Sequence, residues 1–123
     1  MKILITGSSG FIGQHLCKML GKNYSIERFD VQGGSDFDIF NDYFEKRIQR
    51  FDVIYHLAAI TNVNKSFENP QQVFITNVLG TARVAYLCAK YKKKLIYPST
   101  GAVDYPEVSP YAKSKAIAEE IVR

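Results

Sequence analysis

The feature that most constrains the fold is a glycine-rich segment close to the N-terminus. An apolar run that predicts a strand, residues 2–6 (KILIT), leads directly into GSSGFIG, residues 7–13. The pattern predicts a helix over residues 11–20. Glycines at such a turn let the backbone bend tightly and approach a ligand, and the N–H groups at the helix start favour a pyrophosphate. The segment therefore predicts a dinucleotide site, the alternative being a tight turn that binds nothing.

A carboxylate closes the second predicted strand, residues 25–30 (SIERFD). Asp30 is its last residue. In a dinucleotide-binding fold, a carboxylate at this place accepts hydrogen bonds from the ribose of adenosine, which favours NAD over NADP. Arg28 lies close by, so NADP stays open as the less favoured cofactor.

The remaining apolar runs and cap signals predict alternating strands and helices. Asn69–Pro70 and Ser109–Pro110 are N-cap and first-turn signals for two of the helices. The alternation predicts one α/β domain over residues 1–123, a Rossmann-type, doubly wound parallel sheet of about five strands in the order 3-2-1-4-5. The further elements expected are a short strand at 37–40, a helix at 41–49, a strand at 52–59, a helix at 70–91, a strand at 94–99 and a helix from 110.

Composition sets limits on the class of protein. The chain has 123 residues, of which 46% are hydrophobic and 23% charged, typical of a globular protein and not of a disordered one. We find no membrane-length apolar run and no secretory pattern, and we expect a cytoplasmic location without a membrane partner. The net charge of +4 comes largely from lysines at the end of a predicted helix, at positions 90 and 92–94, which favours a solvated helix end over a nucleic-acid partner. Cys17 and Cys88 predict structural thiols, and no metal-ligand spacing is present.

A tyrosine and a lysine lie four residues apart near the start of the last predicted helix. Tyr111 and Lys115 therefore share one helical face. A nearby ammonium favours the phenolate form of a tyrosine, which is the form that accepts a proton. Such a pair is more often a surface pair when no other motif accompanies it. His56 and His15 are predicted to be hydrogen-bonded core histidines and not catalysts.

Several motifs occur in a fixed order along the whole chain. They are TGSSGFIG (6–13), Asp38-Ile39, HLAA (56–59), NVLGT with Asn77, STG (99–101) and YAKSK (111–115). With these motifs the chain resembles the extended short-chain dehydrogenase/reductase superfamily. Within it, the chain is similar to the NAD-dependent epimerase/dehydratase family, of the UDP-glucose 4-epimerase kind.

The resemblance implies roles for individual residues. Tyr111 would be the general base or acid, Lys115 would grip the nicotinamide ribose, and Thr100 would orient the substrate oxygen, with Ser99 as an alternative hydroxyl. Asn77 would lie at the cofactor or bridge elements as a buried polar residue. The implied cofactor contacts are Gly7, Gly10, Phe11, Ile12, Gly13, Asp30, Asp38, Ile39, Leu57, Ala58, Ala59, Thr61, Asn77, Tyr111 and Lys115.

The chain also departs from the pattern of this family. Ten residues separate Thr100 from Tyr111, where family members carry a longer loop. The sequence ends at Arg123, after the YxxxK helix, so we expect a chain without the C-terminal domain that binds the nucleotide-sugar. Apolar residues on two sides of the helix at 70–91 predict a homo-oligomer. The resemblance implies that the contact is made through this helix and the helix at 110–122. The resulting hypothesis is the cofactor-binding part of an NAD-dependent nucleotide-sugar epimerase or dehydratase; the alternatives are a non-catalytic NAD-binding module and an assembly subunit.

Overall fold

A computed structural model of the chain describes residues 1–34 and 38–123. Its strands are β1 (Lys2–Thr6), β2 (Ser25–Phe29), β3 (Val53–His56) and β4 (Lys94–Ile96). Its α-helices are α1 (Phe11–Leu20), α2 (Asp42–Ile48), α3 (Val63–Glu68), α4 (Pro70–Phe74), α5 (Gly80–Lys90) and α6 (Pro110–Val122). Two short 3₁₀ turns, η1 (Val31–Gly33) and η4 (Gly101–Asp104), and a π-helical segment, η3 (Ile75–Leu79), complete these elements.

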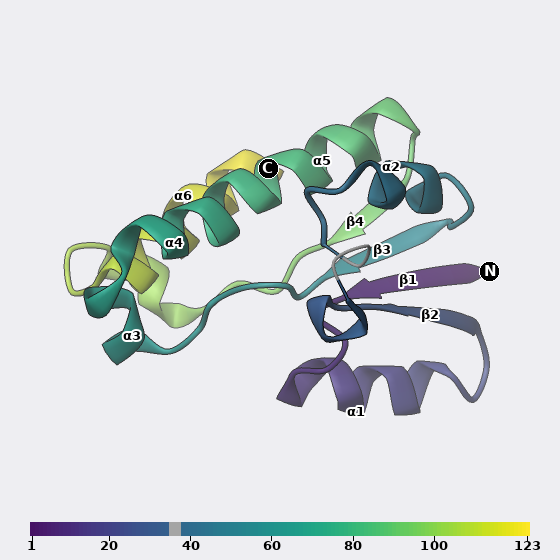
Figure 1. The fold of residues 1–123 in the computed structure, drawn as a ribbon, viewed down its shortest axis with the longest axis horizontal. Coiled ribbons are helices and arrows are strands. Elements are labelled where there is room, and N and C mark those ends of the chain that lie inside the picture. The colour runs from purple at the N-terminus through teal and green to yellow at the C-terminus, as the bar shows by residue number, and fades with distance from the viewer. Residues whose placement is uncertain (35–37) are drawn as a thin grey trace.

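The strands form one parallel sheet in the order β2-β1-β3-β4 (Figure 1). Thr6 at the end of β1 pairs with Phe29 of β2 and with His56 of β3. The carboxyl ends of these three strands are therefore level with one another. This register places the glycine segment, Asp30 and the chain after His56 at the same edge of the sheet, where parallel α/β folds bind ligands.

Helices cover the two faces of the sheet, α1 on one side and α2 and α5 on the other (Figure 1). Successive side chains of a strand point to opposite faces, and β1 follows this rule. Ile3 and Ile5 pack towards α1, whereas Leu4 belongs to the larger core that α2 and α5 complete. The burial of β1 on both faces explains why it reads as an unbroken apolar run.

The long helix predicted at 70–91 forms as three consecutive segments. Asn69 caps its start, where Oδ1 accepts a hydrogen bond from the Gln72 N–H at 3.2 Å, and Pro70 occupies the first turn. The helix then widens into the π-helical segment η3 before continuing as α5. Helix α6, capped by Ser109, packs along α4, η3 and α5. Helix α3 was not predicted, because six residues with one cap leave little periodicity in the sequence.

The third strand expected at 37–40 does not form in its described part. Residues 38–40 make a turn in which Asp38 Oδ1 accepts a hydrogen bond from the Phe40 N–H at 2.9 Å; Phe37 lies outside the described residues. An aspartate side chain that bonds backbone two residues on competes with strand pairing. The described sheet thus has four strands, in the expected order without the third. Within residues 1–34 and 38–123, every helix is too short or too polar to cross a lipid bilayer.

Candidate functional site

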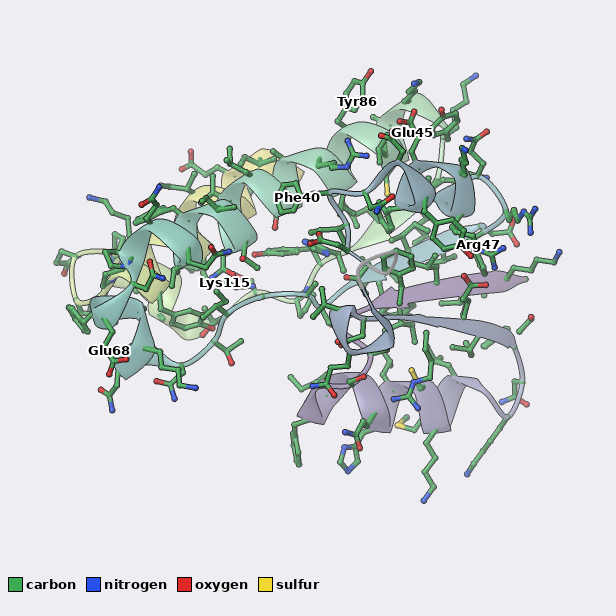
Figure 2. The ribbon with its side chains drawn as sticks, viewed as in Figure 1. Phe40, Glu45, Arg47, Glu68, Tyr86 and Lys115 are labelled. Atoms are coloured by element: carbon green, nitrogen blue, oxygen red, sulfur yellow. The ribbon has the colours of Figure 1, made fainter. Side chains whose placement is uncertain are left out.

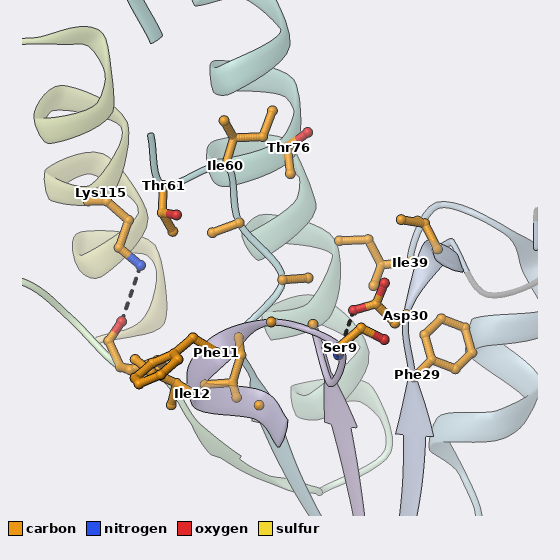
Figure 3. A pocket seen from close by; sticks show the side chains of 18 of the residues that line it. Ser9, Phe11, Ile12, Phe29, Asp30, Ile39, Ile60, Thr61, Thr76 and Lys115 are labelled. Carbon is orange, nitrogen blue, oxygen red and sulfur yellow. Dashed lines mark hydrogen bonds between the residues drawn. The ribbon is translucent and has the colours of Figure 1, made fainter. Parts of the chain in front are cut away.

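One pocket, of about 1050 Å³, opens at the carboxyl ends of the strands (Figure 3). Its size suits a ligand as large as a dinucleotide. The loops after all four strands line it, together with α4, η3 and the start of α6. Of the residues predicted for the site, it brings together Gly7, Gly10, Phe11, Ile12, Gly13, Asp30, Asp38, Ile39, Leu57, Ala58, Ala59, Thr61, Thr100, Tyr111 and Lys115.

The glycine segment forms the pocket wall next to β1. Gly7 has a φ of +65°, and a Cβ there would lie 2.6 Å from the Ala58 nitrogen. A Cβ on Gly13 would lie 2.3 Å from the Gly7 oxygen. The turn is therefore packed against the backbone after β3, and α1 is packed against the turn. Gly10, the N-cap of α1, has no side chain to cap the first N–H groups, which leaves them for an anionic ligand.

Asp30 joins the end of β2 to the glycine segment (Figure 3). Its Oδ2 accepts a hydrogen bond from the Ser9 N–H at 2.9 Å, and its Oδ1 accepts one from the Gln32 N–H at 3.1 Å. The Arg28 side chain also reaches the glycine segment, where it donates a hydrogen bond to the main-chain oxygen of Ser8 at 3.0 Å. The carboxylate thus stands at the pocket, while the guanidinium is bonded to the loop.

Lys115 lies at the other end of the pocket, on α6. Its side chain is buried, with 6% of the residue exposed, and Nζ donates to the Pro98 oxygen at 3.2 Å. Burial lowers the pKa of Lys115 to about 8, although the Glu119 carboxylate acts in the opposite direction. Tyr111, one turn earlier on the same helix, lines the same pocket. A phenol and a readily deprotonated ammonium thus share one wall.

Two hydroxyl groups follow β4. Thr100 Oγ1 accepts a hydrogen bond from the Ala102 N–H at 3.3 Å, which leaves its proton for donation to a ligand. The Ser99 hydroxyl donates to Glu119. Thr100 is therefore the better placed of the two for orienting a substrate oxygen.

Asn77 does not line the pocket. It is buried in η3, where its side chain bonds the Ile60 N–H at 2.8 Å, the Ile60 oxygen at 2.9 Å and the Ser114 hydroxyl at 2.9 Å. Asn77 thus bridges the loop after β3 and α6, as expected for a buried polar residue that joins elements. Short π-helical segments inside α-helices are frequent at functional sites.

The two histidines, His56 and His15, differ in their exposure to solvent. His56 is buried between hydroxyls, with Nδ1 2.8 Å from Thr6 Oγ1 and Nε2 3.0 Å from Thr81 Oγ1. Burial, and to a smaller extent the charge of Lys115, lower the pKa of His56 to about 3, so the ring is neutral. The expectation of a core histidine is confirmed for His56. It is wrong for His15, which is exposed on α1 and lies 2.8 Å from the Phe11 oxygen.

Sequence reasoning missed polar residues on the helix above the pocket. Gln72 and Thr76 both line it, and Gln72 Nε2 donates to Thr76 Oγ1 at 3.2 Å. Their spacing of four residues is compatible with one helical face, but Gln71 and Asn77 are polar too, so the sequence does not single this pair out. In residues 1–34 and 38–123 we find no cluster of three or more side chains suited to a metal ion.

The chain is similar to known proteins in sequence and in fold. Residues 3–123 match the model of the NAD dependent epimerase/dehydratase family. Among curated proteins, the dTDP-D-glucose 4,6-dehydratase of Dictyostelium discoideum is 33% identical in an alignment that covers 83% of this chain and 29% of that protein.

Solved structures show the same fold. The UDP-glucuronic acid 4-epimerase from Bacillus cereus, in complex with UDP-glucuronic acid and NAD, superposes with a TM-score of 0.83 at 30% identity, covering 98% of this chain and 51% of that one. The dTDP-4-dehydrorhamnose reductase from Bacillus anthracis str. Ames, in complex with NADP, has a TM-score of 0.84 at 28% identity. The match covers 98% of this chain and 48% of that one. This chain spans about half of these structures and less of the curated relative. Because the family model covers nearly its whole length, the chain belongs to the NAD-dependent epimerase/dehydratase family.

Proposed function

We propose that residues 1–123 form the NAD-binding unit of an enzyme that epimerises or dehydrates a nucleotide-sugar. The observation that carries the proposal is that one pocket joins the glycine segment and Asp30 to Tyr111 and Lys115. One end suits an adenosine diphosphate, and the other offers proton-transfer groups. The nucleotide-sugar class comes from the relatives named above.

The residues present fit a dinucleotide. The uncapped start of α1 and the glycines before it would hold the diphosphate. Asp30 would accept hydrogen bonds from the adenosine ribose, and Asp38 with Ile39 would lie at the adenine. The remaining wall, Leu57, Ala58, Ala59 and Thr61, would line the middle of the cofactor.

We infer a preference for NAD over NADP. A carboxylate at Asp30 would repel a 2′-phosphate, and Arg28, the nearby cation, is bonded to the Ser8 oxygen. NAD and NADP both occur in the related structures. The preference therefore depends on these two side chains.

Side chains of this chain would carry out the proton transfer. When bound, the nicotinamide ring supplies the acceptor or donor of a hydride. Tyr111 would take the proton of the substrate hydroxyl, and Thr100 would donate a hydrogen bond to that oxygen. The ammonium of Lys115, on the same wall, would favour the phenolate form of the tyrosine.

We also infer a homo-oligomer and a cytoplasmic location. Large apolar side chains on α5 and α6 are exposed, among them Tyr86 at 62% and Ile121 at 37%, and Leu79 before α5 is 56% exposed. Exposed apolar side chains on helices that pack together favour contact with a second copy. Cys17 and Cys88 are free thiols, which suits a reducing compartment.

Calorimetric titration of the chain with NAD and with NADP tests the proposal. We expect NAD to bind more tightly than NADP. Asp30→Asn should reduce this difference in affinity between the two cofactors. Lys115→Met should weaken NAD binding by about tenfold or more, since it removes a charged hydrogen-bond donor. Lys113→Met, an exposed lysine on the same helix, is the matched control and should leave binding unchanged.

Turnover is tested next with UDP-sugars and dTDP-sugars at saturating NAD. Product formation that disappears in Tyr111→Phe would support the assigned base. Binding without turnover would favour the non-catalytic NAD-binding module. A chain that binds neither NAD nor NADP would contradict the proposal and leave the assembly subunit.

A further inference from the structure

Tyr97, directly after β4, contacts the side chains of Lys115 and His56 without lining the pocket itself. The Nζ of Lys115 lies 4.2 Å from the centre of the Tyr97 ring. The same ring stacks with the His56 ring, with centres 5.9 Å apart and planes inclined by 30°. The pocket is lined by the next three residues, 98–100, and not by Tyr97. Any effect of Tyr97 on a ligand must therefore pass through another residue.

The ammonium of Lys115 has few other partners. It carries three donors, and the Pro98 oxygen takes one of them. Lys115 is buried, with 6% of the residue exposed. A buried charge requires compensation, and the negative face of an aromatic ring attracts a cation most strongly where water is excluded. The Tyr97 ring meets this requirement and leaves the remaining donors for a ligand in the pocket.

His56 stacks against the Tyr97 ring and holds that ring in position. Both of its nitrogens are bonded to threonine hydroxyls, at 2.8 Å to Thr6 and at 3.0 Å to Thr81. The imidazole is therefore held in place and adds no positive charge beside the ammonium. Because Thr6 also accepts hydrogen bonds from the Leu57 and Ala58 N–H groups, the support extends to the wall of the pocket.

We propose that Tyr97 is a positioning residue, whose ring holds the ammonium of Lys115 at the pocket wall so that it meets the nicotinamide ribose already oriented. The orientation of Lys115 towards the nicotinamide ribose rests on the proposed function, whereas the contact between Tyr97 and Lys115 does not. Four ionisable groups form or surround the contact between this ammonium and the Tyr97 ring. They are Tyr111 and Glu119 on α6, Tyr97 after β4 and His56 in β3.

The contact can be tested without any cofactor. NMR of lysine-¹³Cε-labelled protein, with the Lys115 signal assigned from Lys115→Arg, follows the charge of Lys115 with pH. Tyr97→Leu removes the ring and keeps an apolar side chain. It should lower the pKa of Lys115 by about 0.4 to 1.5 pH units, since the charged form loses its partner. Tyr97→Phe retains the ring and is the matched control, with the pKa unchanged.

A ring that merely fills space predicts another result. Replacing it by leucine would then leave the pKa of Lys115 unchanged or raise it as water enters, and either outcome overturns the proposal. Should Tyr97→Leu not fold, phenylalanine with one, two or three ring fluorines at position 97 keeps the shape while withdrawing electron density. A stepwise fall in the pKa of Lys115 supports the contact, and a constant value overturns it.

The positioning step is tested with two ligands. ADP lacks the nicotinamide ribose, whereas NAD carries it. Tyr97→Leu should weaken NAD binding by about three- to tenfold and leave ADP binding unchanged; equal NAD affinity in wild type and variant overturns the positioning role. If the wild-type chain binds ADP and not NAD, the proposed function fails. The NMR titration still decides the contact in that case.

Discussion

Arg83 on α5 donates a hydrogen bond from Nε to the main-chain oxygen of Ile39, 2.7 Å away. Its second contact reaches the Asn41 oxygen at 3.4 Å. Gly80, one turn earlier, lies against the same segment, because a Cβ there would be 2.8 Å from Ile39 Cδ1. Helix α5 therefore holds the part of the pocket wall that Asp38 and Ile39 provide.

Removal of the Arg83 contact should weaken cofactor binding from a distance. In Arg83→Gln we expect NAD affinity to fall by about three- to tenfold, because a charged hydrogen bond to the wall is lost. Calorimetry with NAD and ADP measures the effect, which should be the same for both ligands if this wall faces adenosine, as we propose. Lys90→Gln is the matched control, because Lys90 is on the same helix and donates a hydrogen bond to Glu45 at 2.8 Å. Figure 2 shows Glu45 well apart from Lys115. Equal losses in the two variants would contradict a specific role for Arg83.

Gly7→Ala should destabilise the fold. The residue has a φ of +65°, and its Cβ would meet backbone atoms of Leu57 and Ala58 at less than 3 Å. Backbone strain together with such a clash should lower the free energy of unfolding by roughly 2–4 kcal/mol. Urea denaturation measures the loss.

The control for this variant is Gly101→Ala. A Cβ on Gly101 would meet nothing within 4 Å, and its φ is not in the left-handed region. Its free energy of unfolding should be equal to that of wild type or slightly higher. A Gly7→Ala protein as stable as Gly101→Ala would contradict the close packing of the turn.

His56 should make the fold sensitive to acid. Burial depresses its pKa from 6.5 to about 3, so in this range the unfolded chain binds a proton that the folded chain does not. Stability from His56 is complete above about pH 6.5 and is lost as the pH falls towards 3, by up to about 1.4 kcal/mol per pH unit. Urea unfolding of wild type and His56→Gln between pH 7 and 4 isolates this contribution.

In His56→Gln the free energy of unfolding should fall less steeply with acid than in wild type. His15→Gln, which changes the exposed histidine, should retain the wild-type slope. Identical slopes in wild type and His56→Gln would show that folding does not lower the pKa of His56.

Self-association should depend on the exposed apolar side chains of the long helix. We expect a dimer or larger assembly at micromolar concentration, and a shift to monomer in Leu79→Lys, since a charge in an apolar contact is costly to bury. Light scattering measures the mass. Val108→Lys, at an exposed valine in a loop, is the control. A monomeric wild-type chain would refute the oligomer.

The sequence predicted most of the fold where the signals are local. Residues 2–6 and 11–20 form β1 and α1 as expected, and the caps at Asn69 and Ser109 start helices. The ends of β3 and β4 fall short of the predictions, because the apolar runs continue into loops that line the pocket. The turn at Asp38 replaced a strand since its side chain bonds its own backbone.

The candidate site could be predicted as a set of residues but not as an arrangement. Fifteen of its members were available from motifs, and the pocket gathers them. Asn77 was a member by resemblance, yet it bridges Ile60 and Ser114 outside the pocket wall. Arg83 and Tyr97 carry no motif, so their contacts with Ile39 and Lys115 became visible only in the fold.

The sequence by itself determined the elements, the glycine turn and the order of the motifs, because each depends on residues a few positions apart. The tertiary structure decided which side chains meet. Parallel pairing brought the ends of β1, β2 and β3 level, so Asp30 reached the glycine turn and His56 came between Thr6 and Thr81. Such contacts depend on strand register and helix packing between residues far apart in the chain, which no local pattern specifies.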